Sequence, residues 1–436
     1  MPWVSGERVQ EETMRKSFHK IAIAALLLIA GAVVLYSYIY NSPIRFRPKW
    51  QFIPSSQRPA HAAGKTPDNV VLAMADDGNA AITITWRTSE AVADGIAQIA
   101  AEGTGDAPRY LEYPAKTREL HSPELKSDNL VFCHTVTMHD LPLGTSYRYR
   151  VGSAKHDAWS DYATFSLPSG DGDGFTFIYL GDTQSKPAGV GRLLEGADAR
   201  HPETAFYMIG GDIVDNGDYR NLWDDFLAYT KAVFKRKPVV PVMGNHDFGD
   251  HGVYGPRIFS LYFGLPDQVS PAEVRDYSFQ YGNAFFVIVN STDMAVPWLE
   301  EQLREADKRG CEYKIVMFHA PVYNPREDRN NEAAKQYYVP LFDKYAVDLV
   351  LTGHDHSYLR TKMMRNGKPV QPGETGTTYV VATACAKFHK CQPLDFAEKQ
   401  IANLATYQRI TLGKNKLSYT AHDDRGAVVD AFETSK

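Results

Sequence analysis

The chain has 436 residues, of which 44% are hydrophobic and 12% aromatic, so it is long enough to bury more than one hydrophobic core. Its formal net charge of −5 excludes the excess of Lys and Arg that nucleic-acid binding requires, and we expect no nucleic-acid partner. The sequence leaves the oligomeric state open.

The N-terminal region predicts a membrane anchor. Residues 21–40 carry no charged side chain and end in Tyr36, Tyr38 and Tyr40, which is typical of a transmembrane helix with an interfacial aromatic belt. We expect residues 1–20 to form a cytoplasmic tail and the rest of a single-pass cell-membrane protein to lie outside the cytoplasm. A cleaved signal peptide, which would give a secreted protein, is the alternative.

A linker and a β-domain are predicted next. Residues 41–67 contain five prolines and little periodic pattern, as extended linkers do. Residues 68–168 contain short runs of alternating polarity, which predict an all-β sandwich with Trp86 and Tyr147 in its core. The expected strands are 70–72, 81–86, 96–99, 134–138, 147–151 and 162–165.

Five polar clusters follow short apolar runs in the C-terminal part. Helical segments expected at 189–199, 219–232, 296–309 and 332–345 separate the runs, which predicts an α/β fold with parallel strands. Right-handed crossovers place the ends of such strands at one edge of the sheet, so the clusters should meet there. The runs are 175–180, 205–209, 239–243, 314–318 and 348–351. The clusters are Gly181-Asp182-Thr183-Gln184, Gly211-Asp212-Ile213-Val214-Asp215-Asn216, Gly244-Asn245-His246-Asp247, His319, and Gly353-His354-Asp355-His356.

The residue types in these clusters predict a site for two metal ions. Carboxylate and amide oxygens combined with imidazole nitrogens suit Fe, Mn or Zn better than Ca or Mg. Two ions that share a bridging carboxylate can activate a bound hydroxide as the nucleophile and hold phosphate oxygens during an in-line displacement. The expected substrate is therefore a phosphate ester.

The ordered clusters resemble the metallophosphoesterase (calcineurin-like phosphoesterase) superfamily, and within it the purple acid phosphatase-like branch. The resemblance implies a four-layer α/β-β/α sandwich over 173–436, whose second sheet would be completed by C-terminal strands at 378–382, 407–412, 417–421 and 428–432. The runs 83–87 and 141–149 make the preceding domain look like a fibronectin type III fold, which also precedes the catalytic domain in purple acid phosphatases.

The same resemblance assigns roles to residues. His246 would donate a proton to the leaving alkoxide, and Asp247 would either orient its imidazole or cap a turn. The implied ligands are Asp182 for the first metal, Asp212 as the bridge, Asn245 and His319 for the second metal, and His354 and His356 for the second and first metals respectively.

Two positions depart from the family patterns. Gln184 stands where many members have His, and its neutral amide should hold the first metal more loosely. Asp215 stands where purple acid phosphatases have Tyr, so the tyrosinate charge transfer behind the purple colour should be absent. Both residues are expected either to be weak metal ligands or to contact the side chains that bind the metals.

Loops beyond the strand ends should shape the substrate pocket. His251, Asn324 and Arg326 are candidates for substrate binding, and His389 is a similar candidate. Cys385 and Cys391 could close a small disulfide in an extracytoplasmic domain, whereas Cys133 and Cys311 are expected to be buried thiols.

The sequence thus predicts a membrane-tethered, metal-dependent hydrolase of phosphate esters. An acid phosphatase-like monoesterase and a phosphodiesterase or nucleotidase are both compatible with this pattern. An extracytoplasmic binding or adhesion protein with a residual metal site is the alternative from another class. Gln184 favours that alternative, while the otherwise complete ligand set favours the hydrolase.

Overall fold

The computed structural model describes residues 61–74, 80–103, 109–125, 127–168, 174–250, 252–265, 276–290 and 294–436. The predicted tail, transmembrane helix and most of the linker lie outside these ranges, and so does His251. Within the ranges, no helix is both long and apolar enough to cross a membrane.

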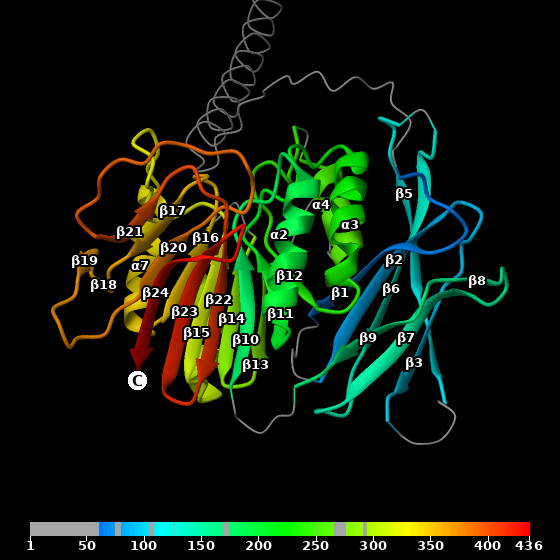
Figure 1. Cartoon of the computed structure of the whole chain (residues 1–436), viewed down its shortest axis with the longest axis horizontal. Helices are drawn as coiled ribbons and strands as arrows, with labels where there is room; N and C mark the ends of the chain where they lie inside the picture. The colour runs from blue at the N-terminus through cyan, green and yellow to red at the C-terminus, as the bar shows by residue number, and fades with distance from the viewer. Residues whose placement is uncertain are drawn as a thin grey trace, which may run out of the picture. The chain divides into compact units, whose positions relative to one another are not determined.

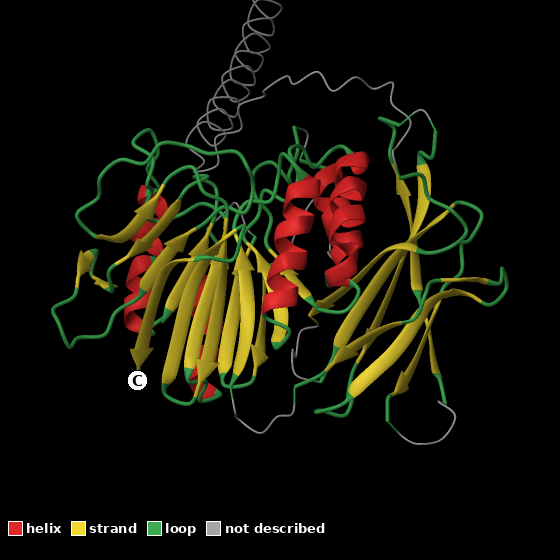
Figure 2. Ribbon diagram, in the orientation of Figure 1, coloured by secondary structure: helices red, strands yellow, loops and turns green. Residues whose placement is uncertain are grey.

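The N-terminal domain is built from two facing sheets among the described residues (Figures 1 and 2). Inward-facing side chains of both sheets, including Ile84, Trp86, Tyr149 and Phe165, are buried between them, as the alternating sequence pattern predicts. The first sheet contains β1 (Asp68–Met74), β2 (Ile82–Ser89), β6 (Leu130–Met138) and β5 (Lys116–His121). The second contains β4 (Leu111–Pro114), β3 (Ile96–Ala101), β7 (Ser146–Ser153), β8 (Ala158–Trp159) and β9 (Ala163–Ser166).

The C-terminal domain has the layered α/β architecture that the clusters predict (Figure 2). Its first sheet carries β10 (Phe175–Leu180), β11 (Thr204–Ile209) and β12 (Val239–Pro241), which run parallel. Its second sheet has the order β13 (Tyr277–Tyr281), β14 (Ala284–Val289), β15 (Tyr313–Phe318), β16 (Leu349–Thr352), β20 (Thr378–Val381), β17 (Tyr358–Thr361) and β21 (Ala397–Ile401). A small hairpin, β18 (Met364–Arg365) and β19 (Lys368–Pro369), lies in the segment between β17 and β20.

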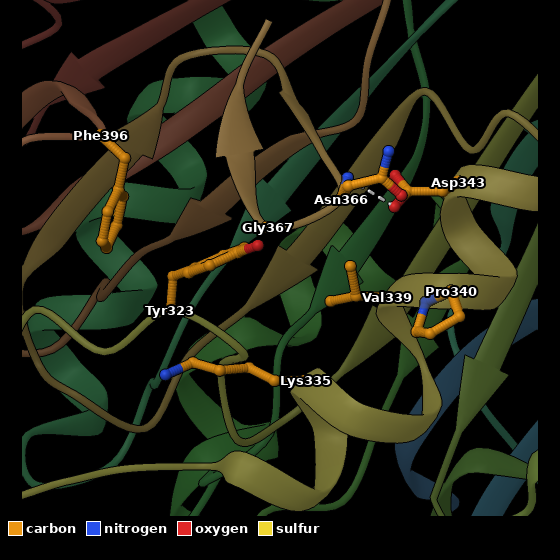
Figure 3. A pocket seen from close by; sticks show the side chains of 8 residues that line it. All are labelled: Tyr323, Lys335, Val339, Pro340, Asp343, Asn366, Gly367 and Phe396. Carbon is orange, nitrogen blue, oxygen red and sulfur yellow. Dashed lines mark hydrogen bonds between the residues drawn. The ribbon is translucent and has the colours of Figure 1, made fainter.

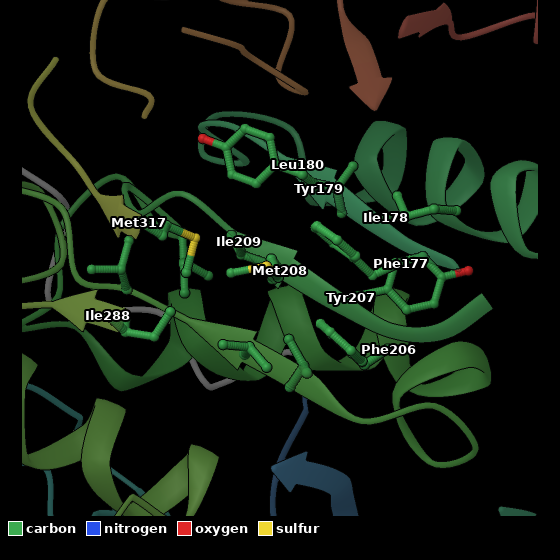
Figure 4. Close-up of a cluster of buried hydrophobic side chains, with 14 of the residues drawn as sticks. Phe177, Ile178, Tyr179, Leu180, Phe206, Tyr207, Met208, Ile209, Ile288 and Met317 are labelled. Atoms are coloured by element: carbon green, nitrogen blue, oxygen red, sulfur yellow. The ribbon is translucent and has the colours of Figure 1, made fainter. Parts of the chain in front are cut away.

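Aromatic side chains join the two sheets of this domain. The ring of Phe177 in the first sheet stacks on Phe206 at 5.3 Å and meets Phe286 of the second sheet edge-on at 5.4 Å. Figure 4 shows the same layer, with Ile288 and Met317 of the second sheet beside Met208 and Ile209 of the first. This apolar layer fixes the sheets against each other and thereby aligns the strand ends that carry the clusters.

Helices cover the outer faces of the two sheets. α2 (Pro187–Arg200), α3 (Arg220–Phe234) and α4 (Tyr254–Phe263) belong to the first half, and α5 (Val296–Lys308), α6 (Glu332–Tyr337) and α7 (Val339–Lys344) belong to the second (Figure 1). The single helix expected over 332–345 is interrupted at Tyr338, since Pro340 lies in the first turn of α7 and has no N–H to continue a preceding helix.

One expectation about the second sheet was wrong for three strands, although β20 lies in that sheet as predicted. Strands β22 (Thr406–Gly413), β23 (Lys416–Asp423) and β24 (Val428–Ser435) extend the first sheet, because β22 pairs antiparallel with β10. β1 runs parallel to β12, with Ala73 opposite Val239, so one sheet continues through both domains.

Candidate metal centre

The five clusters lie where strands β10, β11, β12, β15 and β16 end, and the backbone there is tightly constrained. Asp212, His354 and His356 have φ values of 48°, 71° and 49°, a left-handed conformation that side chains adopt at a cost of about 1–3 kcal/mol each. A Cβ atom at Gly244 would lie 2.2 Å from Oδ1 of Asp212, so only glycine fits beside that carboxylate. The loops are thus shaped to point particular polar groups at one place.

Two groups of possible metal ligands occur among the described residues. The first consists of Asp182, Asp212 and His356, and the second of Asp212, His319 and His354. In each group one donor atom per residue lies within 4.8 Å of the others. Because Asp212 belongs to both groups, the two sets of donors meet at one carboxylate.

Several oxygen atoms at this site lack a hydrogen-bond partner among the described residues. They are Oδ2 of Asp182, Oε1 of Gln184 and Oδ1 of Asn245, and each is buried. An unsatisfied buried acceptor costs roughly 1–3 kcal/mol, so each of these oxygens would be stabilised by a positively charged ligand. Oxygen acceptors combined with imidazoles form a donor set that fits Fe, Mn or Zn ions.

The pKa values of the metal-free site also indicate that positive charge would stabilise it. Burial raises the pKa of Asp182 to about 7. Burial also opposes charge on His319, but the neighbouring Asp212 carboxylate outweighs it and raises the pKa of His319 to about 9. Burial lowers the pKa of His356 to about 3 and that of His354 well below its usual value, which leaves both imidazoles neutral and able to coordinate.

Backbone carbonyls hold the imidazole rings in position. Nδ1 of His319 lies 2.8 Å from the Gly210 carbonyl, and Nδ1 of His356 lies 3.1 Å from the Lys387 carbonyl. A carbonyl only accepts hydrogen bonds, so each Nδ1 carries a proton and each Nε2 is left to face the cluster. Nε2 of His319 is also 3.0 Å from Nδ1 of His354.

The His246 ring is oriented by Asp215, so Asp247 does not take the first of the two roles expected for it. Its Nδ1 donates to the Asp215 carbonyl at 2.7 Å, and its backbone N–H donates to Oδ1 of Asp212 at 2.8 Å. The Asp247 carboxylate accepts from the backbone amides of Ile213, Val214 and Gly244 at 2.8–3.0 Å instead. Among the described residues, no hydrogen bond joins Asp247 to the His246 ring, so Asp247 fixes the loops and not the imidazole.

The two residues that depart from the family pattern also have defined contacts. Nε2 of the Gln184 amide lies 2.9 Å from Nε2 of His356, which places Gln184 at the first group of ligands. The Asp215 carboxylate accepts from the Ser185 hydroxyl at 2.5 Å, and within the described ranges it forms no hydrogen bond with the ligand atoms. Asp215 therefore supports the site through its carbonyl and through Ser185.

The predicted pocket residues differ in how freely they can reach a substrate. Asn324 donates to the Asp355 carboxylate at 3.2 Å, and Arg326 forms a pair of hydrogen bonds with Asp328 at 2.9 and 2.6 Å. Sequence reasoning missed Arg329, which donates to the His354 carbonyl and to Asp355 at 2.8 and 2.9 Å. Arg329 directly follows the Arg326–Asp328 pair in the sequence, and no spacing pattern marked it as a site residue.

The expected disulfide is not formed. Cys385 and Cys391 are both free thiols, and Cys385 is buried with its Sγ 3.3 Å from Nδ1 of His356. Burial raises the pKa of Cys385 to about 12, so this thiol remains protonated. Cys133 is buried as expected, whereas Cys311 is half-buried.

A separate cavity of about 520 Å³ contains none of the cluster residues (Figure 3). Its charged side chains are already paired: Lys335 with Glu332 at 3.1 Å, and Asp343 with the backbone N–H of Asn366 at 2.8 Å. The other lining residues are Tyr323, Val339, Pro340, Gly367 and Phe396.

The fold and the convergent donor groups define a metallophosphoesterase-type α/β domain behind a β-domain. Comparison with known families agrees: residues 175–358 match calcineurin-like phosphoesterase, and residues 67–167 match the purple acid phosphatase N-terminal domain. The chain therefore contains a calcineurin-like phosphoesterase domain preceded by a purple acid phosphatase N-terminal domain.

Proteins similar in sequence include purple acid phosphatases. Purple acid phosphatase 18 of Arabidopsis thaliana is 23% identical over 370 residues, covering 80% of this chain and 78% of the relative. Purple acid phosphatase 1 of Ipomoea batatas is 25% identical over 257 residues, covering 54% and 53%. An uncharacterized protein of Mycobacterium tuberculosis is 26% identical over 331 residues, covering 65% of this chain and 60% of the relative. The chain therefore spans less than two thirds of the length of the Ipomoea and Mycobacterium relatives.

Solved structures show the fold. Purple acid phosphatase PPD1 from yellow lupin (Lupinus luteus) seeds has a TM-score of 0.71 at 18% identity, covering 85% of this chain and 74% of that one. PhoD has a TM-score of 0.64 at 12% identity, covering 87% and 92%.

Proposed function

We propose that the chain hydrolyses phosphate esters at a centre that holds two metal ions. The observation that carries this proposal is the pair of buried donor groups that share Asp212. Asp182, His356 and the Gln184 amide would hold the first ion, and Asn245, His319 and His354 the second, with Asp212 between them. One relative carries the name Fe(3+)-Zn(2+) purple acid phosphatase 12, which supports iron and zinc as the first ions to test.

The bound ions would supply Lewis acidity and activate a water molecule for attack on phosphorus. His246 would do the remaining proton chemistry. Its Nδ1 proton is already held by the Asp215 carbonyl at 2.7 Å, so a second proton on Nε2 makes an imidazolium that can donate to the leaving oxygen. Such a donor typically contributes about 10²–10⁴-fold in rate.

The role of His246 is tested by His246→Ala in the purified full-length protein. We expect the turnover of phenyl phosphate to fall by about 10²-fold or more while the metal content stays at the wild-type level. Loss of both metals in this variant would contradict the assignment as proton donor, because it would make His246 a ligand. Asp250→Asn, on the exposed part of the same loop, is the control.

We also propose that residues 21–40 tether the chain to the cell membrane with residues 41–436 outside the cytoplasm. The uncharged apolar run with its terminal tyrosines supports this. Protease added to intact cells should degrade the β-domain and the phosphoesterase domain. Protection of both domains in intact cells, with degradation after lysis, would contradict the proposed orientation.

A further inference from the structure

The loop between β20 and β21 wraps around the ligands of the first donor group. The backbone N–H of Ala384 donates to the Asp182 carbonyl at 2.9 Å, and the Lys387 carbonyl lies 3.1 Å from Nδ1 of His356. The backbone N–H of His389 donates to the His356 carbonyl at 3.1 Å, and the rings of the two histidines meet edge-on at 5.1 Å. These contacts fix the loop directly beside His356.

The far end of this loop is fixed to the loop that follows His319. The Gln392 N–H donates to the Pro325 carbonyl at 2.8 Å, and its side-chain amide donates to the Arg326 carbonyl at 3.2 Å. The two loops therefore form one connected rim next to the candidate metal centre.

Acidic side chains neutralise most of the positive charge around His356 but not all of it. Arg326 is paired with Asp328, and Arg329 with Asp355. Lys387 is half-buried, yet no carboxylate lies within ion-pair distance of it anywhere in the described ranges. The Lys387 carbonyl lies 3.1 Å from Nδ1 of His356, so the Lys387 side chain begins directly beside this candidate ligand.

A half-buried ammonium group without a counter-ion is positioned to receive one from a ligand. The reacting phosphate would already be neutralised by the two metal ions and His246. A substrate that carries another negative charge would bring a partner for Lys387 to the rim.

We propose that Lys387 selects phosphate esters that carry a second anionic group, such as a carboxylate or another phosphate, on the alcohol part. This inference rests on the proposed hydrolysis at the neighbouring centre. Lys387 is then a specificity-determining residue, while the ligands and His246 serve all phosphate esters alike.

The test compares phenyl phosphate with 4-carboxyphenyl phosphate, which differ in one negative charge. Lys387→Gln should lower kcat/KM for the carboxylated ester by about tenfold relative to phenyl phosphate, as the loss of one charge-assisted hydrogen bond predicts. Lys387→Arg, which keeps the charge, should retain most of the preference. Lys390→Gln, an exposed lysine of the same loop, should leave it unchanged.

Binding provides a second measurement that does not depend on turnover. Calorimetry with benzylphosphonate and 4-carboxybenzylphosphonate should show the same roughly tenfold selective loss in Lys387→Gln at unchanged metal content. An equal loss for both phosphonates, or no loss for either, would overturn the inference. If wild-type protein hydrolyses neither ester, the proposed function fails, and the phosphonate pair still decides whether Lys387 recognises the second charge.

Discussion

Oδ2 of Asp212 lies 3.2 Å from Nε2 of His319, and both side chains are buried. In the metal-free protein, the carboxylates of Asp212 and Asp182 overcome the effect of burial and keep His319 protonated, with a pKa of about 9. Positive charge at this point is therefore needed whether a proton or a metal ion supplies it. A bound metal should displace the proton from His319.

The stability of the metal-free protein should consequently depend on pH. The folded-state pKa of His319, about 9, exceeds its ordinary value of 6.5, so its stabilisation is complete below pH 6.5 and is lost as the pH rises through about 9. The raised pKa of Asp182 has the same sign, but its contribution is lost as the pH rises from 3.8 through about 7 and so lies mostly below this window. The lowered pKa values of His354 and His356 act only below pH 6.5.

We expect the urea midpoint of metal-free protein to fall steadily between pH 6.5 and 9. The slope should be weaker in His319→Asn and in metal-loaded protein. A flat profile for the metal-free wild type would show that His319 is not protonated in this way.

We expect Gln184 to determine how firmly the first metal ion is held. Replacing its neutral amide with imidazole in Gln184→His should slow loss of that ion to a chelator by on the order of tenfold, because imidazole is the stronger donor. Gln184→Leu, which removes the oxygen without much change in volume, should speed the loss. The release of metal into a chromogenic chelator measures both rates, and equal rates in all three proteins would exclude Gln184 as a ligand.

A buried ion network connects the β-domain to helix α3. Asp224 of α3 accepts from Arg87 of β2 at 2.5 Å and from Arg220 at 3.3 Å, and these side chains are at most 1% exposed. Asp224→Leu leaves the two guanidinium groups without this partner and should lower the free energy of unfolding by about 3–5 kcal/mol. Asp225→Asn, one residue along and partly exposed, should change it by about 1 kcal/mol or less.

Chemical denaturation of the three proteins in the same buffer tests this contrast. Equal stability of Asp224→Leu and wild type would mean that the two domains are held together mainly by the continuous sheet and its apolar contacts.

The sequence was informative wherever strand periodicity and cluster order acted together. The strands ending at Asp182, Asp212 and His319 could be predicted because buried parallel strands are apolar throughout and end in Gly and polar residues. The pairing of β22 with β10, and of β1 with β12, could not, since sheet order depends on contacts between segments distant in sequence.

The same limit applies to the site. Residue types predicted which side chains would gather, but not that the Asp215 carbonyl rather than the Asp247 carboxylate would hold the His246 ring. Backbone carbonyls are present at every residue and leave no signal in composition. Lys387 could not be predicted for a similar reason. Its lack of a counter-ion can be seen only in the folded loops.

Metal content and hydrolysis measured on the same preparation test the central claim most directly. Purified full-length wild type, loaded with Fe, Zn or Mn, should contain two ions per chain and hydrolyse phenyl phosphate, because both donor groups share Asp212. Asp212→Asn should lose both the ions and the activity. Wild-type hydrolysis by Asp212→Asn, or a single ion per chain in fully active wild type, would contradict a centre built on this shared carboxylate.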